Sequence, residues 1–259
     1  MPTENSPVFC IGGLRIHALR FEQAIEQIVD LIRRHEGGYV VTPNVDHVVL
    51  VRSNKEFKAS YEHADLVLVD GMPIVWVSKL LGPPLPQKIS GSDLIEPLMQ
   101  KAAEHGFRVY LLGAKKEVAE RAANRLREHF PALNIVGMDS PFIDIEAPVE
   151  AHRPVLDRLR EAKPDVVLFA LGSPKQEIFI HRYKDAIAPA VSIGIGAGLD
   201  FLAGVVPRAP EWVSKSGLEW LYRLGLEPRR LWKRYLVRDP KFAWIVLEEL
   251  YARSKEQRP

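Results

Sequence analysis

Short runs of apolar, mostly β-branched residues alternate along this chain with longer stretches in which apolar positions recur at helical spacing. The short runs predict strands at residues 39–41, 66–69, 109–112, 134–136, 166–170 and 191–195. The stretches between them predict helices near residues 22–34, 45–62, 72–81, 93–104, 116–129, 150–161 and 175–184. Because strands that alternate with helices form parallel sheets, we expect an α/β fold: a doubly wound, mostly parallel sheet with helices on both faces.

The end of the chain has a different composition. Residues 207–259 contain twelve Lys and Arg against seven Asp and Glu, a net charge of +5, whereas residues 1–206 carry −3. Four of the five tryptophans also lie after residue 206. We therefore predict an α/β domain at 1–206 and a basic, Trp-rich helical appendage at 207–259.

The appendage contains a helical pattern with two unlike faces. One face holds Leu231, Trp232, Tyr235 and Leu236, and the other holds Arg229, Arg230, Lys233, Arg234 and Arg238. After Pro240, a second helix has Trp244, Leu247 and Tyr251 on one face. These patterns are typical of helices at an anionic membrane surface, and equally of helices packed on the protein's own sheet. The candidates for membrane contact or for a lid over the site are Trp212, Arg223, Arg229, Arg230, Trp232 and Arg234.

Length and cysteine content limit the class of protein. The 259 residues, 47% of them hydrophobic, are enough for a large core, and the single Cys10 has no partner for an internal disulfide. No signal segment opens the chain, and no apolar stretch reaches the ~18 residues that span a bilayer. We expect a cytoplasmic protein, peripheral on the inner face of the plasma membrane, with no nucleic-acid partner. Whether it forms a homo-oligomer stays open.

Asp70 follows the apolar run at residues 66–69, and Gly71-Met72-Pro73 predicts a turn that opens a helix. In an open α/β sheet, ligands bind at this end of the strands. A half-buried carboxylate there is a candidate general base whose pKa its surroundings can tune. The alternative is a turn aspartate that caps the next helix.

Other polar residues follow the neighbouring strand runs. The side chains of Thr42 and Asn44 can hold a sugar hydroxyl or orient a carboxylate, or they cap the following helix. Lys88 can neutralise a phosphate, whereas Asp93 either contributes to the same site or simply starts a helix.

Three further strand ends suit a phosphate or a nucleotide. Gly113 precedes two lysines at a helix start, where free amides favour an anion, although a solvated helix start fits equally. Gly172 precedes Ser173-Pro174-Lys175-Gln176, in which Gln176 also occupies the position of a capping box. Gly196 lets a backbone approach a ligand closely, and Asp200 can accept bonds from a ribose or a base.

Several common motifs are absent from the sequence. The first apolar run of the sheet leads into Thr-Pro-Asn instead of Gly-x-Gly-x-x-Gly, and no P-loop motif occurs. Dinucleotide dehydrogenases and P-loop NTPases are therefore poor interpretations. With no Asp-x-Asp pair and no zinc-type spacing, we expect neither a metal nor a cofactor.

With these residues in view, the chain resembles the WecG/TagA/CpsF family of bacterial glycosyltransferases, glycosyltransferase family 26, from about residue 38 to residue 238. The matching segments are Thr42-Pro43-Asn44, Ala64-Asp65, Val69-Asp70-Gly71, Ile89-Ser90-Gly91-Ser92-Asp93, Leu112-Gly113, Gly172-Ser173-Pro174-Lys175-Gln176-Glu177, Gly194-Ile195-Gly196, Asp200-Phe201-Leu202-Ala203-Gly204, Arg208-Ala209-Pro210, Gly217-Leu218-Glu219-Trp220-Leu221-Tyr222-Arg223-Leu224 and Glu227-Pro228-Arg229-Arg230. So many matches in the same order are highly specific for this family.

The resemblance implies transfer of a hexose-type sugar from a UDP-sugar to a polyprenyl-diphosphate-linked sugar, with inversion and without a metal. It assigns Asp70 the role of base, places Thr42 and Asn44 around the acceptor or the base, and places Gln176 and Asp200 around the donor. The family usually has arginine where this chain has Lys88, and lysine lacks the bidentate fork that suits a diphosphate.

We therefore expect a UDP-sugar-dependent hexosyltransferase of cell-surface polysaccharide assembly. One alternative is an enzyme that resembles a UDP-sugar epimerase, which bound NAD would indicate. The other is a non-catalytic nucleotide-sugar-binding or membrane scaffold protein, which UDP binding without turnover would indicate.

Overall fold

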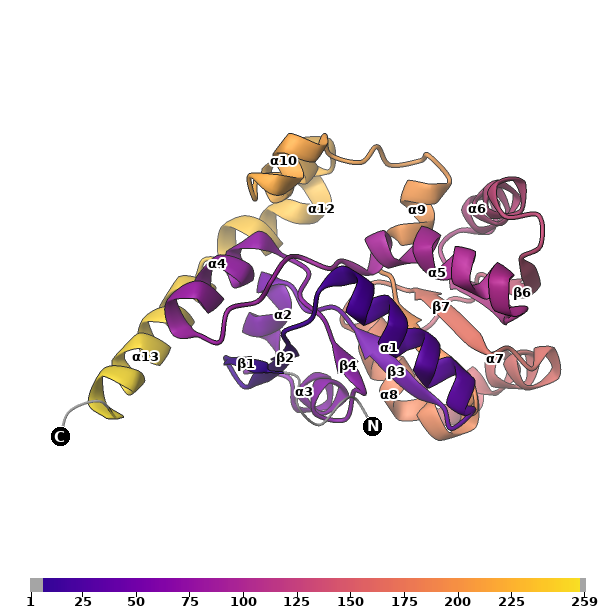
Figure 1. Cartoon of the computed structure of the whole chain (residues 1–259), viewed down its shortest axis with the longest axis horizontal. Coiled ribbons are helices and arrows are strands. Elements are labelled where there is room, and N and C mark those ends of the chain that lie inside the picture. The colour runs from indigo at the N-terminus through magenta and orange to yellow at the C-terminus, as the bar shows by residue number, and fades with distance from the viewer. Residues whose placement is uncertain (1–6, 257–259) are drawn as a thin grey trace.

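The computed structural model describes residues 7–256, and a sheet of six parallel strands forms its centre (Figure 1). The strands lie in the spatial order β4-β3-β8-β7-β5-β6. They are β3 (Gly38–Val41), β4 (Leu66–Val67), β5 (Arg108–Gly113), β6 (Asn134–Asp139), β7 (Val166–Ala170) and β8 (Val191–Gly194). The expected parallel α/β sheet is confirmed.

Helices cover both faces of the sheet. One face packs on α1 (Phe21–Arg34), α5 (Gly91–His105), α6 (Lys116–His129) and α9 (Gly198–Leu202). The other packs on α2 (Val45–Leu50), α3 (Lys55–Glu62), α4 (Met72–Leu81), α7 (Val149–Ala162) and α8 (Lys175–Ile187). Successive strand residues alternate between these two cores, so strands buried on both faces read as continuous apolar runs.

Two of the expected elements have different bounds. The run at residues 66–69 forms only the two-residue β4, although the chain stays extended up to Asp70, whose N–H donates to the Pro43 carbonyl (2.8 Å). The single helix expected at 45–62 is divided into α2 and α3. The Asn54 side chain accepts a hydrogen bond from the Phe57 N–H (2.9 Å), so it caps a new helix at that point.

An antiparallel hairpin before the sheet was not predicted. Its strands, β1 (Val8–Ile11) and β2 (Leu14–His17), are joined by Gly12 and Gly13, both with positive φ. Two glycines between apolar runs are a hairpin signal that the sequence did carry. The Val67 N–H donates to His17 Nδ1 (3.0 Å), so the hairpin covers the edge strand β4.

The chain after α9 is helical, as expected for the appendage. It forms α10 (Glu211–Lys215), α11 (Glu219–Leu226), α12 (Pro228–Trp232), the π-helix η1 (Lys233–Arg238) and α13 (Lys241–Glu256). α13 packs against α2, α4 and β1, and its far half projects beyond the rest of the molecule (Figure 1). Within residues 7–256, no helix is both long and apolar enough to cross a membrane.

The carboxyl ends of β5 and β7 approach each other at Gly113. This residue has a φ of +110°, and a Cβ added to it would lie 2.5 Å from the Ala170 carbonyl oxygen. We expect Gly113→Ala to lower the free energy of unfolding by about 1–3 kcal/mol, because the backbone would be strained and the strands displaced. Urea or thermal unfolding measures this loss.

Gly225→Ala is the control for that experiment. Gly225 lies in α11 with no atom within 4 Å of an added Cβ, so alanine there should be neutral or stabilising by up to about 1 kcal/mol. Unchanged stability in Gly113→Ala would show that the close approach does not constrain the fold.

Candidate active site

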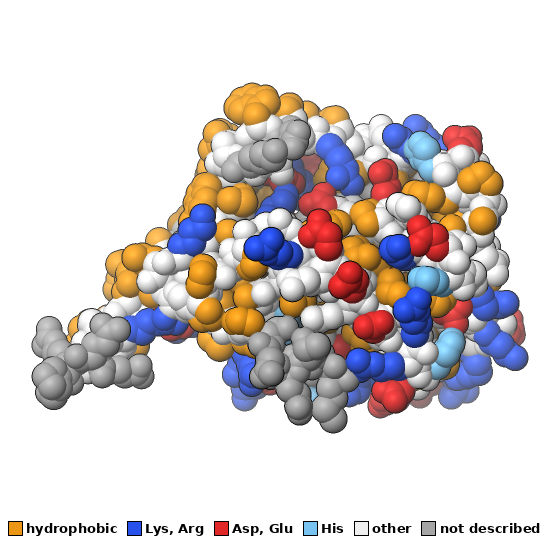
Figure 2. Space-filling model, viewed as in Figure 1, with side chains coloured by type: hydrophobic (Ala, Val, Ile, Leu, Met, Phe, Trp, Pro, Cys, Tyr) orange, Lys and Arg blue, Asp and Glu red, His pale blue; other side chains and the backbone are white. Residues whose placement is uncertain are grey.

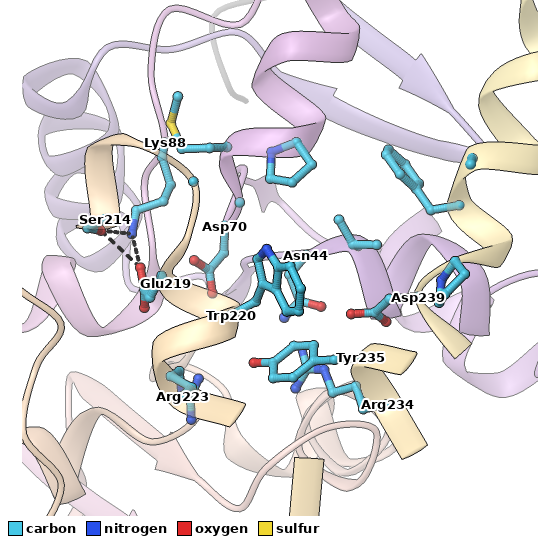
Figure 3. A pocket seen from close by; sticks show the side chains of 18 of the residues that line it. Asn44, Asp70, Lys88, Ser214, Glu219, Trp220, Arg223, Arg234, Tyr235 and Asp239 are labelled. Atoms are coloured by element: carbon cyan, nitrogen blue, oxygen red, sulfur yellow. Dashed lines mark hydrogen bonds and ion pairs between the residues drawn. The ribbon is translucent and has the colours of Figure 1, made fainter. Parts of the chain in front are cut away.

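A cavity of about 520 Å³ lies between the carboxyl ends of β3 and β4 and the helices that follow residue 210 (Figure 3). Its α/β wall consists of Asn44, Val45, Asp70, Gly71, Met72, Pro73 and Lys88. Its helical wall consists of Ser214, Gly217, Glu219, Trp220, Arg223, Arg234, Tyr235, Leu236, Asp239, Pro240, Phe242 and Ala243. The cavity therefore exists only where the C-terminal helices meet the α/β unit.

Asp70 lies deep in this cavity, at the end of the extended segment that follows β4. Burial raises the pKa of its carboxyl group to about 6; the positive charge of Lys88 opposes that shift, and the carboxylates of Glu219 and Asp93 add to it. A carboxylate with this pKa is ionised at neutral pH and is still basic enough to accept a proton. Gly71 stands at the N-cap of α4 without a side-chain cap, so the alternative of Asp70 as a helix cap is wrong.

Lys88 brings a positive charge to the same end of the cavity. Its ammonium group donates to Glu219 Oε2 (2.9 Å) and to Ser214 Oγ (3.0 Å), and it lies 4.0 Å from Asp93. Burial alone would lower the pKa of Lys88, but the carboxylates of Asp70 and Glu219 outweigh it and raise that pKa. Lys88 is therefore held as a cation beside Asp70.

A second group of charges joins η1 to α2. Asp46 is only 4% exposed, and its carboxylate pairs with Nε of Arg238 (2.7 Å) and with Nε of Arg234 (3.4 Å). Asp239 follows these arginines on the chain, and burial, together with the charge of Asp46, raises its pKa to about 6. The far end of the cavity thus contains a second carboxyl group with a raised pKa.

Aromatic rings lie between the two ends. The rings of Trp220 and Tyr235 are 5.9 Å apart, and Figure 3 shows Trp220 between the carboxyl groups of Asp70 and Asp239. Leu236, Phe242 and Ala243 add an apolar wall on the side of α13. The cavity therefore offers charged groups, flat ring faces and aliphatic surface within one space.

The structure brings five of the residues singled out from the sequence to this cavity: Asn44, Asp70, Lys88, Arg223 and Arg234. Asn44 also caps α2, since its Oδ1 accepts from the His47 N–H (3.4 Å). Thr42 does not line the cavity, and its hydroxyl lies beside Gly91 at the start of α5. Asp93 does not line it either, because its carboxylate pairs with Arg208 (3.0 Å).

The residues predicted around a donor lie at the same edge of the sheet but outside this cavity: Gly113, Gly172, Gln176, Gly196 and Asp200. The capping box expected at Gln176 does not form. Its Oε1 accepts from the Gly196 N–H (3.1 Å) and its Nε2 donates to Glu177 Oε1 (3.0 Å), so it links the loops after β7 and β8. Burial raises the pKa of Asp200, and the charges of Arg230 and Arg223 oppose that shift.

The interfacial helix expected at residues 229–238 needs correction. The segment consists of α12 followed by η1, with Leu231 buried and Tyr235 in the cavity, so its apolar face is not turned to solvent as a whole. Arg234 and Arg238 turn inward because the buried Asp46 requires a counter-charge. Trp212 and Trp232 are exposed, and neither they nor Arg229 and Arg230 line the cavity.

The sequence analysis missed six polar or aromatic residues of the cavity: Ser214, Glu219, Trp220, Tyr235, Asp239 and Phe242. Tyr235 had been placed on the apolar face of a helix, and Asp239, which precedes Pro240, had been given no role. Glu219 lies within a segment that the family resemblance already included, which is the signal that would have found it.

Comparison with known proteins extends this picture to the whole chain. The model of the glycosyl transferase WecG/TagA/CpsF family matches residues 9–256. The chain belongs to this family. A protein of Bacillus spizizenii (strain ATCC 23059 / NRRL B-14472 / W23) is 36% identical over 222 residues, 86% of this chain and 83% of the relative. A protein of Bacillus subtilis (strain 168) is 33% identical over 230 residues, 87% of both chains. Both relatives are named N-acetylglucosaminyldiphosphoundecaprenol N-acetyl-beta-D-mannosaminyltransferase.

The match to this glycosyltransferase family includes the C-terminal helices as well as the α/β unit. Both walls of the cavity therefore lie inside the matched region.

The raised pKa of Asp70 predicts a pH-dependent stability. Because its pKa is near 6 in the folded chain and near 3.8 when unfolded, protonation stabilises the fold at low pH, and this stability is lost as pH rises to about 6. We expect Asp70→Asn to be more stable than wild type by about 1–3 kcal/mol at pH 7.5 and equal to it at pH 3.5. Thermal unfolding across this range measures the difference, and a constant difference would contradict the assigned pKa.

Proposed function

We propose that this chain transfers a hexose-type sugar from a UDP-sugar to a sugar linked to polyprenyl diphosphate, in the assembly of a cell-surface polysaccharide. The names of both relatives support N-acetylmannosamine as the sugar and an N-acetylglucosaminyl diphosphate lipid as the acceptor. The observation that carries the proposal is Asp70, an ionisable carboxyl group at the carboxyl edge of a parallel sheet inside a cavity.

The reaction is a single displacement. The Asp70 carboxylate takes the proton of the acceptor hydroxyl while that oxygen forms a bond to the anomeric carbon of the donor. The bond between the anomeric carbon and the phosphate oxygen breaks on the opposite face, and UDP leaves with the bonding electrons. The configuration at the anomeric carbon is therefore inverted.

The negative charge on the departing diphosphate needs compensation. Lys88 and Arg223 line the cavity, and the charges of Arg230 and Arg223 act on Asp200. These cations, with the amides at the strand ends near Gly113 and Gly172, supply positive charge to a diphosphate without a metal ion. We therefore propose a metal-independent transfer.

We place the two substrates on different parts of the carboxyl edge. The donor lies over the ends of β5, β7 and β8, near Gln176, Gly196 and Asp200. The acceptor sugar enters the cavity, where its hydroxyl reaches Asp70. The apolar wall of Leu236, Phe242 and Ala243 suits the lipid side of this acceptor.

We further propose that the protein contacts the inner face of the plasma membrane. Exposed apolar side chains follow one another on α4 and α13, and we call them the α4–α13 ridge: Trp76, Leu80, Trp244, Leu247 and Tyr251. Figure 2 shows hydrophobic side chains over the projecting part of the molecule that contains α13. Aromatic residues of this kind settle at a membrane interface.

The role of Asp70 is tested by Asp70→Asn. We expect transfer to fall about 100- to 10,000-fold, because an amide cannot accept the proton, while calorimetric binding of UDP is kept. In the wild type, kcat/KM should fall as pH drops below about 6, and this acidic limb should be absent from the residual activity of the variant.

Asp157→Asn is the matched control, because Asp157 is an exposed carboxylate on α7 that pairs with Arg160 far from the cavity. Its transfer should equal that of wild type. Wild-type turnover in Asp70→Asn would remove this residue from the mechanism. Loss of transfer in EDTA, with recovery on adding a divalent metal, would overturn the metal-independent route.

The membrane proposal is tested by co-sedimentation with vesicles that contain anionic lipid. Because Arg234 and Arg238 face inward, we expect the double variant Trp244→Ser, Leu247→Ser to lose more binding than an increase in salt removes. Phe142→Ser is the control, since Phe142 is also exposed but lies outside the α4–α13 ridge. Equal sedimentation of all three proteins would contradict membrane contact through the ridge.

A further inference from the structure

One oxygen of Asp239 lacks a partner within the protein. Oδ1 is buried, and no hydrogen-bond partner for it is found among residues 7–256. Asp239 lines the cavity, and in Figure 3 its carboxylate faces the space beside Trp220. A buried acceptor without a hydrogen bond is costly, so such an atom calls for an explanation.

Two ordinary structural roles do not explain this carboxylate. It does not cap α13 through Oδ1, because the Phe242 N–H bonds to the backbone oxygen of Asp239 (2.9 Å) and Oδ1 accepts no hydrogen bond. Among residues 7–256 it forms no ion pair with the neighbouring arginines, although their charges act on it, and Arg234 and Arg238 direct their Nε atoms to Asp46. Asp239 is therefore available to something that enters the cavity.

The surroundings of Asp239 define the chemistry of that ligand. A carboxylate accepts hydrogen bonds from hydroxyl groups, and such charge-assisted bonds are stronger than neutral ones. Figure 3 shows Trp220 between Asp239 and Asp70, with Tyr235 beside it, and the flat ring of Trp220 suits the apolar C–H face of a sugar ring. Two carboxylates on either side of aromatic rings thus fit one sugar with several hydroxyls.

We propose that Asp239 accepts a hydrogen bond from a ring hydroxyl of the acceptor sugar, while the hydroxyl that reacts lies at Asp70. This inference rests on the proposed transferase function and adds a specificity-determining residue to it. Asp239 then selects and orients the acceptor, and it takes no proton in the reaction. The donor, placed over the ends of β5, β7 and β8, does not touch it.

The first test separates the two substrates by steady-state kinetics. The probe is N-acetylglucosaminyl diphosphate carrying a farnesyl chain as acceptor, with UDP-N-acetylmannosamine as donor. We expect Asp239→Ala to raise the KM for the acceptor about 10- to 100-fold, the worth of one hydrogen bond to a charged group, and to leave the KM for the donor within twofold. The acidic limb of the pH profile should persist, because it belongs to Asp70.

The second test identifies the hydroxyl. Acceptor analogues that lack one ring hydroxyl each are assayed with the wild type and with Asp239→Ala. We expect one analogue to be as poor for the wild type as the complete acceptor is for the variant, and to lose nothing further in the variant, as a double-mutant cycle requires. Glu248→Gln is the control, because Glu248 lies on α13 and binds Arg52 outside the cavity.

The outcomes distinguish this inference from the proposed function. Absence of transfer by the wild type would overturn the function itself. Transfer with an unchanged acceptor KM in Asp239→Ala, or with equal increases for both substrates, would overturn the role of Asp239 alone. A loss of kcat in Asp239→Asn as large as that expected for Asp70→Asn would also overturn it, because Asp239 would then act in the chemistry.

Discussion

The arrangement of the cavity depends on a buried carboxylate. Asp46 lies on α2 with almost no contact with solvent, and a buried charge requires a partner. Its partners, Arg234 and Arg238, come from η1, nearly two hundred residues further along the chain. This pairing fixes where η1 lies, and thereby where Tyr235, Leu236 and Asp239 face the α/β unit. The rest of the helical wall, with Ser214 and Glu219, is joined to the α/β unit through Lys88.

The second wall also sets the chemistry of Asp70. Covering the strand ends removes water from its carboxyl group, and this desolvation raises the pKa more than Lys88 lowers it. Glu219 offsets the effect of Lys88 on the pKa of Asp70, because it binds the ammonium group and adds its own negative charge near Asp70. The C-terminal helices therefore do more than close the site, since they raise the pKa of the candidate base toward neutral pH.

Local sequence patterns predicted what local forces determine. The apolar runs identified every strand of the parallel sheet, and the helices at 72–81 and 116–129 have the expected bounds. The sequence also contained signals for the helix cap at Asn54 and for the glycine turn of the first hairpin, but neither element was predicted. The pairings of Lys88 with Glu219 and of Asp46 with Arg238 join residues more than a hundred positions apart, and no periodicity encodes such contacts. For that reason Arg234 and Arg238 were placed on the charged face of a helix without their partner Asp46, and Asp239 was missed.

The order of side chains through the cavity gives a physical reason for a lipid-linked acceptor. Charged groups gather at Asp70, Lys88 and Glu219 and again at Arg234 and Asp239, whereas Leu236, Phe242 and Ala243 line the side of α13. On the same helix, Trp244 and Leu247 are exposed beyond the cavity. A sugar joined through a diphosphate to a polyprenyl chain likewise combines hydroxyl and charged groups with an apolar part. The apolar side chains beside α13 would hold the lipid part of the proposed acceptor. With the α4–α13 ridge at a membrane, its sugar would then point toward Asp70.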